Sequence, residues 1–188
     1  MKWPVKLVFS LLLIAYPVAV YFGIQAFSVK QVALVLLVLF AVRLFYLKPS
    51  TADSAAGWAA TTAGIILILA VLLFDNALFL KLYPVFINLV MLLVFSWSLL
   101  NPPPVIERLA RKIDPQLSEL GVRHTRQVTQ VWCGFFIVNG AIALYTALFS
   151  SMADWALYNG LIAYLLMGLL FAAEFIVRKI RQQRAGER

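Results

Sequence analysis

The sequence predicts an all-α protein that crosses a membrane about six times as one helical bundle. Of its 188 residues, 63% are hydrophobic and only 13% are charged, whereas a soluble domain is roughly 45 to 50% apolar. The apolar residues form long blocks separated by short polar stretches, as transmembrane helices do. The longest polar stretch, residues 101–127, follows the fourth block. We therefore expect a single transmembrane domain over residues 1–188.

The first two blocks span residues 7–22 and 29–47. A short basic lead precedes the first block, so a signal peptide is the alternative to a retained helix. The length of the block and the lack of a clean A-x-A site favour retention. Pro17 predicts a kink in this helix. Arg43 lies one turn from the end of the second block, where it either reaches the headgroups or pairs inside the bundle.

The next two blocks span residues 58–74 and 84–100. Ala60 and Gly64 form a small-xxx-small pair, which lets a neighbouring helix approach closely. Asn88 is the conspicuous polar residue of the fourth block. We expect it to form an interhelical hydrogen bond, with a ligand contact as the alternative.

Residues 101–127 form the expected cytoplasmic loop. Asn101 is expected to cap a short helix that Pro115 ends. One face of this helix is apolar: Val105, Ile106, Leu109 and Ile113. The charged residues lie opposite or beside it: Glu107, Arg108, Arg111 and Lys112. This pattern is typical of an amphipathic helix in the membrane interface.

The last two blocks span residues 128–150 and 156–176, and a basic tail covers 177–188. One face of the fifth block predicts a helix contact or, alternatively, a ligand site: Trp132, Phe136, Asn139, Ala143 and Thr146. Glu174 falls on the inward side of the sixth block. An acid inside a span is a functional candidate, but Arg178 one turn later predicts a structural ion pair.

The lysines and arginines predict the orientation. With six spans and both termini in the cytoplasm, all but two of the 16 lysines and arginines lie on the cytoplasmic side; Lys30 and Lys81 are the exceptions. This distribution follows the positive-inside rule. It also accounts for most of the net charge of +8, so nucleic-acid binding is not expected.

The residues do not indicate enzyme chemistry. Cys133 lies inside an apolar block and His124 is the single histidine, so a thiol nucleophile lacks the partners that it needs. One histidine and scattered carboxylates also lack metal-ligand spacing. His124, at the entrance of the fifth block, is expected to be an interfacial residue without function, with a catalytic base as the alternative. We expect no catalytic residue, metal or cofactor.

Four runs of residues suggest a family: FLKLYPVFINL from Phe79, PPPVIERLAR from Pro102, VTQVWCGFFIVNGAIAL from Val128 and WALYNGLIAYLLMGLLFAAEF from Trp155. They resemble an uncharacterised bacterial membrane-protein family associated with gene clusters for aryl polyene pigments and fatty-acid-like pathways. More distantly, F-x-K-x-x-P at Phe79 and W-x-x-F-F-x-x-N at Trp132 resemble the intracellular septation protein A family.

The first resemblance implies an accessory protein of the bacterial inner membrane, beside soluble synthases and an acyl carrier protein. The second implies a cell-envelope scaffold that binds other envelope proteins. In the adaptor hypothesis, a basic surface holds anionic lipid or an acidic carrier: Arg108, Arg111, Lys112, Arg123 and Arg126. Alternatively, these charges only set topology and contact headgroups. A third hypothesis is a small transporter or lipid-handling bundle with a polar pathway: Arg43, Asn88, Asn139 and Glu174.

Overall fold

The computed structural model describes residues 15–46 and 54–186, and within them the side chains of residues 15–42 and 61–181. All regular structure in these residues is helical, so the all-α prediction is confirmed. Residues 7–14 of the first predicted block lie outside the described residues.

The N-terminal part contains α2 (Tyr16–Ala26), α3 (Val29–Tyr46) and α4 (Ser54–Phe74). α3 agrees with the block predicted at 29–47, and α4 begins at Ser54 instead of at residue 58. Pro17 lies in the first turn of α2, where its missing N–H costs no helical hydrogen bond. Pro17 therefore does not cause the predicted kink in the described part of this helix.

A single turn, α5 (Leu78–Lys81), leads into α6 (Tyr83–Leu100), and α7 (Val105–Ile113) follows. The prediction that Asn101 caps the short helix is wrong. Asn101 ends α6, and its amide Nδ2 donates to the Trp97 carbonyl at 3.2 Å. The prolines at 102–104 have no N–H to continue α6, so the next helix begins only after them.

The C-terminal part contains α8 (Glu119–Phe149), α9 (Met152–Leu157), the π-helical turn η1 (Tyr158–Ile162) and α10 (Ala163–Gly186). α8 begins well before the predicted start at residue 128. Ser118 caps it, because its Oγ accepts the Gly121 N–H at 3.2 Å. Helix therefore already covers the last part of the predicted loop 101–127, and the position of this part relative to the membrane stays a prediction. Likewise, helix continues through the predicted tail as far as Gly186.

Three helical segments of the described chain are long and apolar enough to cross a membrane: Leu78–Leu100, Glu119–Phe149 and Met152–Arg181. α3 and α4 contain the shorter apolar stretches Val29–Val42 and Thr61–Phe74. The lengths and composition of these segments support an integral membrane protein.

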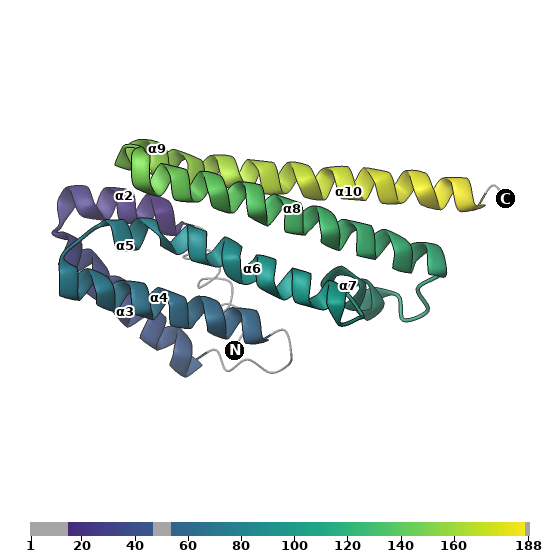
Figure 1. The fold of residues 1–188 in the computed structure, drawn as a ribbon, viewed down its shortest axis with the longest axis horizontal. Helices are drawn as coiled ribbons and strands as arrows, with labels where there is room; N and C mark the ends of the chain where they lie inside the picture. The colour runs from purple at the N-terminus through teal and green to yellow at the C-terminus, as the bar shows by residue number, and fades with distance from the viewer. Residues whose placement is uncertain (1–14, 47–53, 187–188) are drawn as a thin grey trace.

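The helices form an elongated bundle in which α6, α8 and α10 run side by side in alternating directions (Figure 1). α2, α5 and α9 gather at one end, and α7 lies at the other, beside the start of α8. One apolar cluster joins α2, α3, α4, α5 and α9 and includes Val20, Phe40, Val71, Leu80 and Trp155. A second joins α6 to α8 through Phe95, Val128, Trp132 and Phe136.

The break between α5 and α6 leaves a carbonyl that another helix satisfies. In a continuous helix the amide of residue 84 would donate to the carbonyl of Leu80, but Pro84 has no N–H. The Tyr16 hydroxyl donates to this carbonyl instead, at 3.0 Å. The indole Nε1–H of Trp155 donates to the next carbonyl, that of Lys81, also at 3.0 Å. These two bonds tie α2 and α9 to α5, the turn that leads into α6.

The predicted close approach at Gly64 is present. A Cβ at this position would lie 2.6 Å from the Phe40 ring atom Cζ of α3, closer than van der Waals contact allows. Phe40 is buried and also makes an edge contact with the Tyr83 ring at 5.7 Å between centroids. Since the ring is held on both sides, it has little room to yield. The side chain of Ala60 lies outside the described residues.

Gly64→Ala is expected to lower the free energy of unfolding by about 1–3 kcal/mol, because the added methyl overpacks the contact with Phe40. The measurement is unfolding by SDS titration in detergent micelles. Gly168→Ala is the matched control, since a Cβ there meets no atom within 4 Å. Phe40→Leu should rescue part of the loss. Equal stability of the two alanine variants would contradict the close approach.

Candidate functional site

The buried face of α8 carries most of the polar side chains inside the described bundle. All members of the predicted stripe are buried: Trp132, Phe136, Asn139, Ala143 and Thr146. The prediction that this face makes helix contacts is therefore confirmed. The face continues toward the start of α8 with four further buried residues: His124, Thr125, Val128 and Thr129. The polar members fall into two groups, an amide network in the middle of the bundle and a charged cluster at one end.

The amide network joins α6, α8 and η1. Asn139 Nδ2 donates to Asn88 Oδ1 at 2.9 Å, and the Tyr158 hydroxyl donates to Asn139 Oδ1 at 2.9 Å. Asn88 Nδ2 donates to the Pro84 carbonyl at 2.8 Å. The interhelical hydrogen bond predicted for Asn88 is thus present. Gly140 allows it, because a Cβ there would lie 3.1 Å from Asn88 Cβ.

The side-chain amide of Asn159, in η1, forms hydrogen bonds at the same interface. Asn159 Nδ2 donates to Thr146 Oγ1 at 3.2 Å and to the Trp155 carbonyl at 2.9 Å. The neighbouring residue Tyr158 also reaches α8, so two consecutive side chains of the π-helical turn bind one partner helix. Such turns often occur at functional sites. Here the polar groups are bonded to one another, and this arrangement fits a structural joint.

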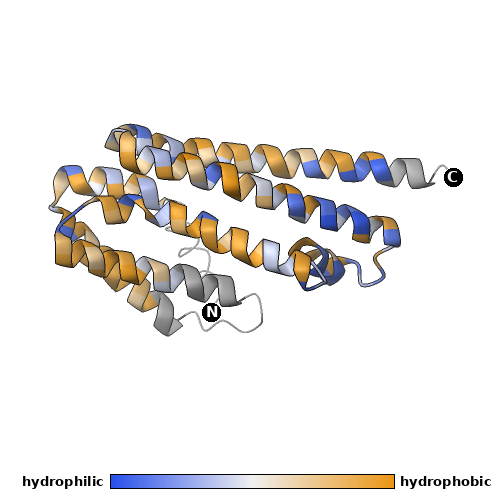
Figure 2. Ribbon diagram, viewed as in Figure 1, coloured by the Kyte–Doolittle hydropathy of each residue, from blue (hydrophilic) through white to orange (hydrophobic). Residues whose placement is uncertain are grey.

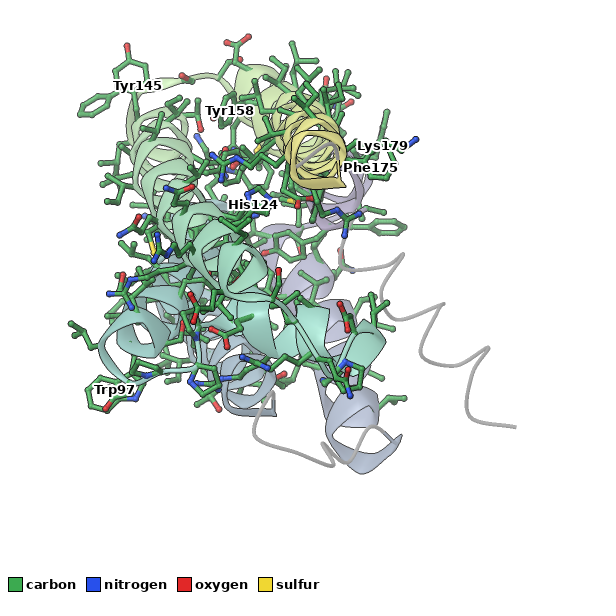
Figure 3. All side chains as sticks on the ribbon, turned by 90° about the vertical axis from the view of Figure 1, so that its right-hand side faces the viewer. Trp97, His124, Tyr145, Tyr158, Phe175 and Lys179 are labelled. Carbon is green, nitrogen blue, oxygen red and sulfur yellow. The ribbon has the colours of Figure 1, made fainter. Side chains whose placement is uncertain are left out.

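The charged cluster lies between α8 and α10, toward the end that carries α7. We call it the His124 cluster; it consists of His124, Gln127, Glu174, Arg178 and Arg181. His124 is only 8% exposed. Its Nε2 lies 3.2 Å from Glu174 Oε1, and its Nδ1 lies 3.2 Å from Arg181 Nη1. Figure 3 shows His124 between the two helices, whereas Phe175 and Lys179 lie on the outer side of α10.

The two contacts determine the tautomer of His124. A guanidinium can only donate, so Nδ1 must accept from Arg181 and carries no proton. Nε2 then carries the hydrogen and donates to the Glu174 carboxylate. Arg181 Nη1 also donates to Gln127 Oε1 at 2.8 Å, which holds the guanidinium against α8. Both ring nitrogens are therefore engaged with side chains of α10.

The predicted ion pair between Glu174 and Arg178 is present but long, at 3.9 Å from Nε to Oε1. The nearer partner of Glu174 is His124 on another helix. His124 does not lie at the helix entrance that the sequence predicts, because α8 begins before it, and the residue is buried in the bundle. Its place at the membrane interface stays a prediction. The ring connects two helices.

The five residues proposed as a basic surface lie at this same end, on α7 and the first turns of α8 (Figure 2). They differ in how they are held. Arg123 and Arg126 are exposed. Arg108 Nε donates to the Pro103 carbonyl at 2.6 Å. Lys112 is exposed on the last turn of α7. The side chain of Arg43, the remaining polar candidate, lies outside the described residues.

The position of Glu107 differs from the prediction of which residues lie on the charged face of α7. The sequence places Glu107 opposite the apolar face, but its side chain is buried and only 6% exposed. Arg111 compensates the buried carboxylate with two contacts to Oε1, from Nη2 and Nε, both at 2.8 Å. α7 packs on α8, and Glu107 is turned into the bundle. Arg111 is therefore needed for the fold and is not freely available to a partner.

No group of three or more histidine, cysteine, aspartate or glutamate side chains that could hold a metal ion occurs in the part of the chain that the structure describes. Cys133 is half-buried, and its Sγ accepts from Ser96 Oγ at 3.6 Å. The absence of a catalytic residue remains a prediction.

The sequence contained a signal for His124. Positions 124, 128, 132 and 136 repeat every four residues and continue the stripe of α8 backwards. Residues 121–127 are mostly polar, so the sequence alone places them in the loop. The stripe then begins only after them, and His124 is left out of it. The burial of Glu107 had no comparable signal, because it depends on the direction from which α8 meets α7.

Comparisons with protein-family models, curated proteins and solved structures find no match to this chain.

His124→Ala and Glu174→Ala are each expected to destabilise the protein, and the two effects should be coupled by about 1–2 kcal/mol, because either change removes the same hydrogen bond. The double-mutant cycle is measured by SDS titration in micelles. His124→Ala combined with Lys179→Ala is the control pair, whose effects should add to within about 0.5 kcal/mol. Coupling no larger than in the control would show that the two side chains do not interact.

Proposed function

We propose that this protein is a non-catalytic accessory protein of the bacterial inner membrane, an adaptor that holds an acidic soluble partner at the cytoplasmic membrane surface. The observation that carries the proposal is the concentration of cations at one end of the bundle, with Arg123 and Arg126 exposed on α8. Such a surface attracts an acidic protein and orients it during encounter. The resemblance to the pigment-cluster family favours an acyl carrier protein of an aryl-polyene-like pathway, or its synthases, as the partner.

The proposed topology has six spans and both termini in the cytoplasm. α3 and α4 have 18 and 21 residues, which at about 1.5 Å per residue gives about 27 and 32 Å, close to the thickness of a bilayer core of about 30 Å. Lys30 and Lys81 lie at the end away from the basic surface. Lys30 pairs with Asp75 at 3.3 Å, and Lys81 Nζ donates to the Ser150 carbonyl at 3.0 Å. The positive-inside rule then assigns the basic end to the cytoplasm.

The internal polar residues favour an adaptor over a transporter. Asn88 and Asn139 bond to each other, and Glu174 binds His124. A pathway for a polar solute needs groups that can exchange partners with it, whereas groups bonded within the protein serve packing. The second candidate is an envelope scaffold of the septation type. The apolar face of α10, with Leu165, Leu169 and Phe175 exposed, is a surface on which another membrane helix can pack.

The partner proposal is tested by crosslinking and pull-down from bacterial membranes. Arg123→Gln with Arg126→Gln should weaken recovery of an acidic carrier protein or synthase roughly three- to tenfold, because two surface charges are removed. Arg123→Lys with Arg126→Lys keeps the charge and serves as the matched control. Arg111 is left unchanged, since it neutralises the buried Glu107. Recovery should also fall at high salt.

Two other results would contradict the adaptor proposal. Recovery of a carrier protein that is unaffected by the glutamine changes would exclude the basic surface as its site. Recovery of division or envelope proteins alone, again unaffected, would favour the scaffold.

The topology is tested by labelling single cysteines with a membrane-impermeant maleimide in spheroplasts. In a Cys133→Ser background, a cysteine placed by Ala153→Cys should react from outside, because the turn between α8 and α9 is expected in the periplasm. A cysteine placed by Gln116→Cys should react only after lysis. Both positions are exposed in the structure. The reverse pattern would overturn the orientation.

A further inference from the structure

The amphipathic helix α7 is held rigidly by bonds at its start and by the burial of one side. Ser98, itself buried, donates through Oγ to the Phe95 carbonyl at 2.7 Å and accepts the Val105 N–H at 3.1 Å. This serine of α6 thereby fixes the first turn of α7. The buried Glu107 and its partner Arg111 fix one side of the helix against the bundle.

The apolar face of α7 is divided between two environments. Val105 and Ile106 are half-buried against the cluster of Phe95 and Trp132. One turn later, Leu109 is 47% exposed, and Ile113 is 86% exposed. The second half of the apolar face therefore remains uncovered by the bundle. Leu109 and Ile113 are four residues apart, so they stand beside each other on the helix surface.

The position of α7 in the chain keeps this apolar pair at a membrane boundary. α7 lies between two segments that are long and apolar enough to cross a membrane, Leu78–Leu100 and Glu119–Phe149. The connections are residues 101–104 and 114–118, and a chain of this length reaches at most about 17 Å when fully extended. α7 also packs on α8. It cannot move away from the ends of these helices.

The charges next to the apolar pair match an anionic lipid surface. Arg108 precedes Leu109 in the sequence, whereas the acid of α7, Glu107, is buried and paired with Arg111. The exposed part of the helix therefore combines apolar side chains with positive charge. Helices of this composition lie in the headgroup region, with the apolar side chains inserted and the cations near lipid phosphates.

We propose that the last turn of α7 is a membrane anchor, in which Leu109 and Ile113 insert into the bilayer surface and Arg108 binds the phosphates of anionic lipids. This assignment goes beyond the adaptor proposal, because it gives α7 a lipid partner and leaves the exposed arginines of α8 for a soluble protein. The anchor also sets the distance between the basic surface and the bilayer.

The anchor is tested by spin labels on single cysteines in a Cys133→Ser background, with the full chain in nanodiscs. Labels at positions 109 and 113 should be more accessible to oxygen, which concentrates in lipid, than to a water-soluble nickel chelate. Labels at 112 and 126 are the matched controls and should show the opposite preference. The contrast should be larger in nanodiscs that contain phosphatidylglycerol than in pure phosphatidylcholine.

Preferential access of the nickel chelate at positions 109 and 113 in both lipids would overturn the anchor. A depth that does not change with phosphatidylglycerol would overturn the role of the anionic headgroups. If the two positions become protected only when a bacterial cytosolic extract is added, the apolar pair binds a protein and the lipid assignment is wrong. The nanodiscs contain no soluble partner, so these results do not depend on the pull-down experiment.

Discussion

The arrangement of the bundle depends on one constraint, that polar groups on the buried face of α8 must find partners among neighbouring helices. Water is not available inside a membrane bundle, so each unpaired group would cost free energy. Asn139 binds α6 and η1, Thr146 binds η1, and His124 binds α10. Because each bond has a defined length and direction, it fixes the rotation and the height of the partner helix. Apolar packing alone would allow more freedom.

The same constraint explains how the interruptions between helices are tolerated. Pro84 removes a donor at the start of α6, and the Tyr16 hydroxyl replaces it from α2. At the other end of α6, the prolines at 102–104 stop the helix, and Ser98 supplies an acceptor for the first amide of α7. A residue that interrupts one helix thus creates a specific bond to another element. The interruptions contribute to the tertiary structure instead of only weakening it.

The cations at the basic end serve different purposes, which composition does not separate. Arg111 and Arg181 hold buried partners and belong to the fold. Arg178 and Lys179 lie over the Phe175 ring, with their cationic groups 5.6 and 5.3 Å from its centroid, where the ring face attracts positive charge. Arg123 and Arg126 are exposed and remain for an external partner. The proposed function depends on this last group, since charges already used inside the protein cannot bind a ligand without a cost in stability.

The sequence by itself determined the helical class, the apolar segments and the stripe on α8, because these follow from composition and from a period that each helix shows locally. It also determined the bond expected for Asn88, since a polar residue in an apolar helix must be satisfied nearby. Only the tertiary structure decided that Glu174 binds His124 in preference to Arg178, that Glu107 is buried and that half of the apolar face of α7 is exposed. Each of these depends on which neighbouring helix covers a given side. That information lies in contacts between residues far apart in the chain, which a local period does not contain.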